Sequence, residues 1–135
     1  MTVKFDTSTV EGRIRKAVMR GIIRGTEDVR TEAVSLIQNT KKTGRVYRRG
    51  GVEHQASAPG EPPASDTGQL VNSIGTVYDT TTLTGRVVAK SKHAPPLEFG
   101  TKNMEPRPFL RPALANKQAD IQKYVAEELS REFKL

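Results

Sequence analysis

The 135-residue chain is basic, with 22 Lys and Arg against 15 Asp and Glu, a formal net charge of +7. It has no Cys, which excludes disulfides, thiol chemistry and cysteine-based zinc sites. No stretch approaches the roughly 20 apolar residues of a membrane-spanning helix, and residues 1–6 lack the apolar core of a signal peptide. We therefore expect one small, soluble, intracellular-type domain over residues 1–135. Only 35% of the residues are hydrophobic, so either the core is thin or some apolar surface is reserved for a partner.

Residues 8–39 carry the strongest helical signal. Apolar or small residues recur there at intervals of three and four, which predicts one face of an α-helix. Ser8 and Glu11 have the spacing of a capping box at its start. Unbroken, such a helix is about 45 to 50 Å long at 1.5 Å per residue.

Three small residues in this helix, Ala17, Gly21 and Gly25, are spaced four apart. Each glycine costs about 1 kcal/mol relative to Ala in a helix interior, so the pair needs a reason. Two interpretations stay open: a smooth ridge that lets another element approach closely, or a bend or break of the helix near the glycines.

Residues 40–66 form a long basic loop. Strand-forming residues on either side of Gly50-Gly51 predict a small β-hairpin, weakly ordered in the free monomer because an isolated two-stranded ribbon is marginal. The proline-rich stretch 56–64 is extended and incompatible with a helix. A connection of this length is normally functional or disordered. Five basic residues without an acidic one between them lie in its first part: Lys41, Lys42, Arg45, Arg48 and Arg49.

The next segment is short and mixed. Asp66 and Gln69 form a second capping box, opening a short helix through Leu70 and Ile74. Residues 76–79 and 86–90 are rich in β-branched side chains and predict two strands joined by a turn. Residues 97–100 form a tight turn or one helical turn, ended by Gly100 with a positive backbone angle.

A last helix is predicted beyond residue 110, with Pro112 at its first position. Its apolar stripe comprises Leu110, Leu114, Ile121, Val125, Leu129 and Phe133. The resulting fold class is α+β: a small antiparallel β-sheet packed against a long N-terminal helix and a C-terminal helix, with a long extended loop that carries a β-hairpin.

The sequence gives little support for a catalytic site or a metal site. His54 and His93 lie in different loops without paired carboxylates, which favours plain polar roles over metal ligation. His54, Ser57 and Asp66 could be assembled into a triad on paper, but triads are recognised by geometry. Glu127 and Glu128 are most simply interpreted as a solvated helix face. We expect no cofactor, no metal site and no enzymatic activity.

Nucleic-acid binding is the stronger alternative. The cluster from Lys41 to Arg49, with Tyr47 interleaved, could meet phosphates. Basic surface can equally pair with an acidic protein partner. A DNA-binding accessory domain that uses the 41–49 loop therefore stays open. The long helix adds further positive charge at Arg13, Arg15, Lys16, Arg20 and Arg24.

Two stretches carry a family resemblance. The first runs over residues 47–64 and continues through 66–70 and Ser73-Ile74; the second runs over residues 93–101 and 107–114. The order Pro-Gly-Glu-Pro-Pro, Thr-Gly-x-Leu, Leu-Glu-Phe-Gly-Thr, Arg-Pro-Phe-Leu is similar to the phage minor tail-component family named after gene product ten of phage HK-ninety-seven. The resemblance covers residues 43 to 115. The family usually has an aromatic at the position of His93 and often one at Pro96, and both are missing here.

The resemblance implies a virion structural protein at the head–tail junction or tail end, without catalysis. Such proteins form rings, usually hexamers, as tail-completion, tail-terminator or neck subunits, assembled in the cytoplasm of the bacterial host. The implied partners are copies of the same chain and the neighbouring neck, connector and tail-tube proteins. Genomic DNA would pass through the ring without sequence-specific binding, and no membrane is involved.

Two sets of residues follow as candidate sites. We expect the hairpin of residues 46–55 to cross to an adjacent subunit or ring. Four motif side chains are expected either in the core, where they pack the last helix onto the sheet, or at a subunit interface: Leu97, Phe99, Phe109 and Leu110. Arg107 and Arg111 are either surface charges or bidentate partners of a carboxylate such as Glu98, inside one subunit or between subunits. The assembly loop comprises Arg45, Val46, Tyr47, Arg48, Arg49, Gly50, Gly51, Val52, Pro59, Pro62 and Pro63. The family-motif core or interface comprises Leu70, Leu97, Glu98, Phe99, Gly100, Arg107, Phe109, Leu110 and Arg111.

Overall fold

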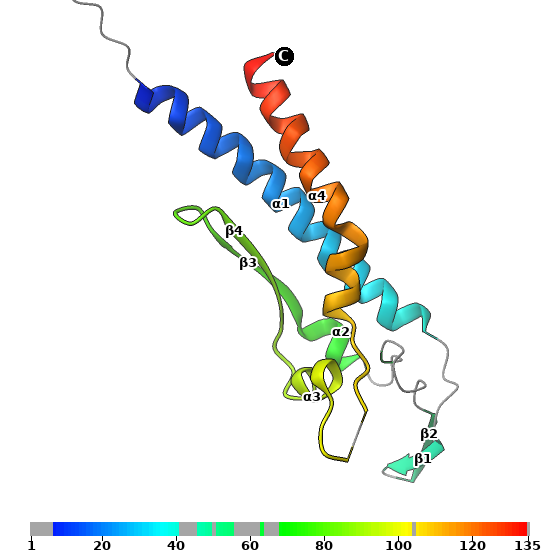
Figure 1. Cartoon of the computed structure of the whole chain (residues 1–135). Helices are drawn as coiled ribbons and strands as arrows, with labels where there is room; N and C mark the ends of the chain where they lie inside the picture. The colour runs from blue at the N-terminus through cyan, green and yellow to red at the C-terminus, as the bar shows by residue number, and fades with distance from the viewer. Residues whose placement is uncertain are drawn as a thin grey trace, which may run out of the picture.

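The computed structural model describes residues 7–40, 46–49, 51–55, 63, 68–103 and 105–134, and only the backbone of residues 7, 47–49 and 52–55. Figure 1 shows a long helix at the centre of the molecule, with a two-stranded sheet and a second long helix packed against it. This arrangement confirms the predicted α+β class. The elements in chain order are α1 (Thr7–Asn39), β1 (Val46–Arg49), β2 (Val52–Gln55), α2 (Gln69–Ser73), β3 (Ile74–Asp79), β4 (Thr84–Ala89), α3 (Ala94–Phe99) and α4 (Leu110–Phe133).

The helix α1 is continuous over its 33 residues, and its small-residue ridge faces α4. A Cβ atom added to Gly21 would lie 2.6 Å from the Cα of Val125, and one added to Gly25 would lie 2.6 Å from Cγ1 of Ile121. Neither distance leaves room for a side chain. The close-approach interpretation of the glycines is therefore confirmed, and the predicted alternative of a break is wrong.

A different face of α1 covers the β3–β4 sheet, whose antiparallel register runs from Ile74 opposite Ala89 to Asp79 opposite Thr84. The carboxylate of Glu27 on α1 accepts hydrogen bonds from Thr76 (3.1 Å) and Tyr78 (2.7 Å). These two hydrogen bonds hold β3 against α1. In Figure 1 α4 crosses α1, so that its C-terminal part lies away from the sheet and its first turns lie near α2, at the base of the sheet.

The buried core lies where the C-terminal half of α1 meets the base of the sheet and the start of α4. Apolar side chains from α1, β3, α3 and the start of α4 pack together at this point. Its buried members are Val29, Ala33, Ile37, Ile74, Ala94, Phe109 and Ala113.

The local predictions between residues 46 and 100 are largely confirmed. The hairpin pairs Arg49 with Val52 across the Gly50-Gly51 turn, and Gly51 has a φ of 78°. The short helix α2 begins one residue after Gly68, which occupies the N-cap position in a left-handed conformation. The predicted capping box of Asp66 and Gln69 is therefore wrong, because Gln69 is the first residue of α2 and its N-cap has no side-chain hydrogen bond. Both strands of the second hairpin begin two residues earlier than predicted.

Candidate functional site

Most of the family-motif residues meet at one place, which we call the α3–α4 corner: residues 97–103 and 105–115. Gly100 ends α3 with φ 77° and ψ 173°, a region of backbone space that is essentially restricted to glycine. Its amide donates a hydrogen bond to the carbonyl of Pro96 (2.8 Å), and the amide of Arg107 donates one to the carbonyl of Leu97 (2.6 Å). The predicted positive angle at Gly100 is confirmed, and it reverses the chain so that α4 starts beside α3.

Glu98 is the structural centre of the corner. Its side chain is buried, at 5% exposure, and its carboxylate accepts three backbone hydrogen bonds from the start of α4. Oε2 accepts from the amides of Phe109 (2.8 Å) and Leu110 (3.0 Å), and Oε1 accepts from the amide of Arg111 (2.9 Å). These are amides that a helix leaves without internal partners, and a negative charge there also suits the helix dipole.

The next residue, Pro112, has no amide hydrogen and therefore needs no partner. It occupies the third position of α4, because the helix begins at Leu110 with Phe109 as its N-cap. The prediction of Pro112 at the first position is wrong by two residues. The Glu98 carboxylate therefore accepts the hydrogen bonds of residues 109–111, and at residue 112 the proline leaves no amide hydrogen that needs an acceptor.

Within the chain, the expected bidentate pairing of Arg111 with Glu98 is also wrong. The contacts of the carboxylate are with backbone amides, including that of Arg111 itself. The guanidinium of Arg111 lies over the ring of Phe99 instead, 4.7 Å from its centroid. Arg107 is half-buried. The hydrogen bond from its backbone amide to the carbonyl of Leu97 places it at the turn between α3 and α4.

Phe99 is the most exposed of the large apolar side chains among the described residues, at 62%. The expectation that it belongs to the core is therefore wrong. In α3 the buried positions are occupied by Ala94 and Glu98, and Phe99, the neighbour of Glu98, consequently faces solvent. The other expected core residues are confirmed: Phe109 is fully buried, and Leu97 and Leu110 are partly buried against the core. Leu70, expected in the core or at an interface, is also partly buried there.

An open pocket of about 410 Å³ lies beside Phe99. Its walls are mostly apolar, and the Arg111 side chain forms part of the rim. Leu114, one turn along α4 from Arg111, is 51% exposed. The residues that line the pocket are Glu98, Phe99, Pro106, Pro108, Arg111, Pro112 and Ala115.

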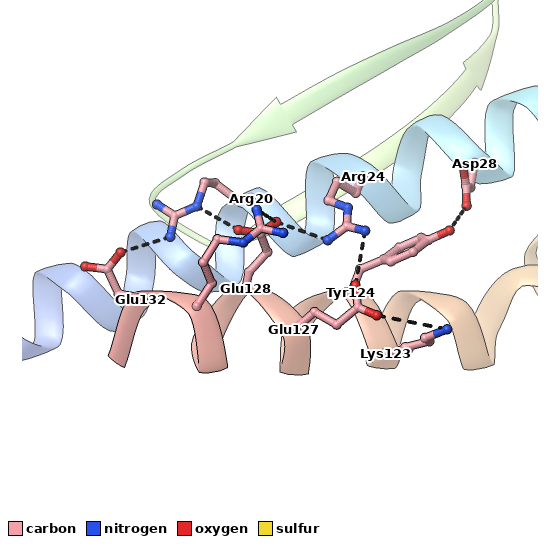
Figure 2. A network of polar contacts seen from close by, with 9 residues as sticks. Arg20, Arg24, Asp28, Lys123, Tyr124, Glu127, Glu128 and Glu132 are labelled. Carbon is pink, nitrogen blue, oxygen red and sulfur yellow. Dashed lines mark hydrogen bonds and ion pairs between the residues drawn. The ribbon is translucent and has the colours of Figure 1, made fainter. Parts of the chain in front are cut away.

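Charged side chains of α1 and α4 pair along the contact between the two helices (Figure 2). We call this network the α1–α4 seam; its members are Arg13, Arg20, Arg24, Glu127, Glu128 and Glu132. Arg20 and Arg24 both donate to the carboxylate of Glu128, at 3.0 and 3.1 Å. Arg13 and Arg20 donate to Glu132, at 2.8 and 3.1 Å. The side chain of Glu128 is only 4% exposed, so the prediction of a solvated face is wrong for this residue.

The seam changes the electrostatics of α1. Hydrogen bonds from Arg20, and more weakly from Arg24, hold the pKa of Glu128 below its ordinary value against the opposing effect of burial. Hydrogen bonds from Arg13 and Arg20 lower the pKa of Glu132 in the same way. Three of the five basic residues that the nucleic-acid alternative places on α1 are therefore matched by carboxylates of the same chain.

A fourth basic residue, Arg15, is also engaged: it donates to the carbonyl oxygens of Thr80 and Thr81 at the turn of the second hairpin. Sequence reasoning missed these pairings. The signal was present, because arginines on one helix and glutamates on the other recur at helical spacing, but nothing local shows that the two helices pack together.

The assembly loop is described in part. In Figure 1 the β1–β2 hairpin lies beyond the C-terminal end of α1, apart from the other labelled elements. Val46 is 49% exposed, whereas Pro63 is buried. Arg45, Gly50, Pro59 and Pro62 lie outside the described residues, as do the side chains of residues 47–49 and 52–55.

Within the described ranges, no group of three or more His, Asp or Glu side chains is placed to hold a metal ion. Ser57 and Asp66 of the hypothetical triad lie outside those ranges. No described helix combines the length and the apolar character that crossing a membrane requires. Comparisons of the chain with family models, with curated proteins and with solved structures find no match.

Proposed function

We propose that the chain is a structural protein of a tailed-phage or prophage virion, acting at the head–tail junction. In this proposal it is one subunit of a tail-completion, tail-terminator or neck ring, usually hexameric in the family that it resembles. The observation that carries the proposal is the ordered set of four motifs between residues 59 and 110.

The positions of the motif residues support a structural role. Glu98 caps α4, Gly100 reverses the chain and Phe109 fills the core. Each of these residues performs a task in folding, and Phe99 is left as an exposed apolar side chain at the corner. Motifs of this kind preserve a shape and a contact surface.

The hairpin supplies a second element suited to assembly. A ring needs a heterologous interface, in which one surface of a subunit meets a different surface of the next. A two-stranded ribbon has unpaired edges on both sides, and such edges can add to the sheet of another chain. We place this contact at residues 46–55, which project from the body of the molecule in Figure 1.

The test is complementation of a parent phage or prophage from which the gene has been deleted. Replacing residues 46–55 by ten Gly and Ser residues keeps the loop length and removes the hairpin. We expect this variant to fold with the circular dichroism and melting temperature of the wild type and to give no infectious particles. Val77→Thr, at a strand position as exposed as Val46, is the matched control and should complement.

The particles identify the function by their form. Tailless heads beside loose tails indicate joining, and over-long tails indicate termination. Infectious particles from the hairpin replacement contradict the role given to residues 46–55. Particles that never contain the protein, or salt-sensitive DNA binding by the isolated chain, contradict the structural proposal and favour the DNA-binding alternative.

A further inference from the structure

We propose that the pocket at the α3–α4 corner is a docking site for an extended acidic segment of a partner protein. The segment places a proline or aliphatic side chain against Phe99 and a carboxylate on Arg111. This inference rests on the proposed function, because it names the surface and the chemistry through which an assembly subunit would hold a neighbour.

The apolar half of the site is formed by rigid groups. Three prolines, Pro106, Pro108 and Pro112, line the pocket together with Phe99. Proline rings have little conformational freedom to lose, so binding against them costs little entropy. Grooves lined by aromatic side chains are a common recognition surface for extended proline-containing segments. With Leu114 one turn away, the corner carries the two most exposed large apolar side chains of the described residues.

The charged half of the site is Arg111. The arginines of the α1–α4 seam have carboxylate partners within the chain. Among the described residues no carboxylate pairs with the guanidinium of Arg111, which stacks on Phe99. The one carboxylate that lines the pocket, Glu98, is occupied by three backbone amides. The corner therefore presents an available cation beside an apolar surface.

Charge also decides which occupant fits. The guanidinium group is planar, so its N–H groups can bind a carboxylate in a bidentate manner while its face lies on an aromatic ring. The chain as a whole carries a net charge of +7, so its long-range field favours an acidic occupant at this corner over a second basic copy. An acidic segment of a different protein is attracted by the same field, and is the occupant that the charges favour.

The experiment is a titration of the full-length protein with capped synthetic peptides, followed by backbone amide NMR shifts. The probe is acetyl-Ala-Pro-Glu-Pro-Leu-Ala-amide, with matched peptides that carry Gln or Lys in place of Glu. Arg111→Glu and Phe99→Ala change exposed positions of the corner, and Arg86→Glu, an exposed charge reversal on β4, is the control. The melting temperature of each variant shows whether its fold is retained.

We expect the Glu peptide to shift amides of residues 98–115 and to bind at least tenfold more weakly to Arg111→Glu and to Phe99→Ala. Its affinity for Arg86→Glu should stay within twofold of wild type, and Arg111→Glu should instead prefer the Lys peptide. Equal binding of the Glu and Lys peptides, shifts confined to β3 and β4, or no binding at millimolar peptide overturns the inference.

The two proposals fail separately. If particles require the protein but the Glu peptide does not bind, the virion function survives and the docking site does not. If the peptide binds as described but particles lack the protein, the docking site survives in another context. Concentration-dependent dimerisation that Phe99→Ala abolishes, with no peptide binding, assigns the corner to a second copy and overturns the choice of partner.

Discussion

Removing the carboxylate of Glu98 should destabilise the protein more than removing any exposed charge. Glu98→Ala leaves three amides at the start of α4 without their acceptor. Phe109 is fully buried, so water cannot reach its amide, and an unsatisfied buried amide costs about 1–3 kcal/mol. The other two amides are partly accessible and can be rehydrated. Loss of a helix cap adds about 0.5–2 kcal/mol, which gives a total of about 2–5 kcal/mol.

Urea unfolding, followed by circular dichroism, measures this cost. With a urea dependence of about 1.5 kcal/mol per molar, within the range of small proteins, the midpoint should fall by about 1.3–3.3 M. Glu98→Gln keeps the shape and one acceptor oxygen but turns an N–H group toward an amide, so it should lie between Glu98→Ala and wild type.

Glu105→Ala is the matched control for this series. Glu105 lies in the same corner and is exposed, so its loss should change stability by less than about 0.5 kcal/mol. If Glu98→Ala and Glu105→Ala unfold at the same urea concentration, the Glu98 carboxylate is not what holds α4 in place. The reasoning from the three hydrogen bonds would then be refuted.

Two further predictions concern the contact between α1 and α4. Gly21→Leu places a side chain where the backbone of Val125 lies, so it should lower stability by about 1–3 kcal/mol or more and reduce the melting temperature, whereas Gly12→Ala, with open space around it, should raise it slightly. The pKa of Glu128 is lowered in the folded state, so its contribution to stability is present above its ordinary pKa and is lost as the pH falls through the lowered value. Urea midpoints measured from pH 6 to pH 3 should therefore fall less steeply for Glu128→Gln than for wild type, and parallel curves would contradict the role of the seam.

Local physics was enough to predict most of the elements. The periodicity of residues 8–39 predicts a helix because each turn repeats the same side-chain spacing, whatever it packs against. The pair Gly50-Gly51 predicts a two-residue turn, and Gly100 a positive φ, because few other residues reach those backbone angles. These features depend on neighbours in the chain, so the sequence carries them by itself.

The assignment of charged and aromatic side chains to core or surface was decided by the tertiary structure. Glu128 meets Arg20 across 108 positions of sequence, and Glu98 meets amides more than ten residues away. No local pattern distinguishes these two glutamates from solvated ones. Phe99 is exposed because α3 has one inward position at its end and Glu98 occupies it. Which residue fills such a position depends on the element that packs there, and only the folded chain brings that element into place.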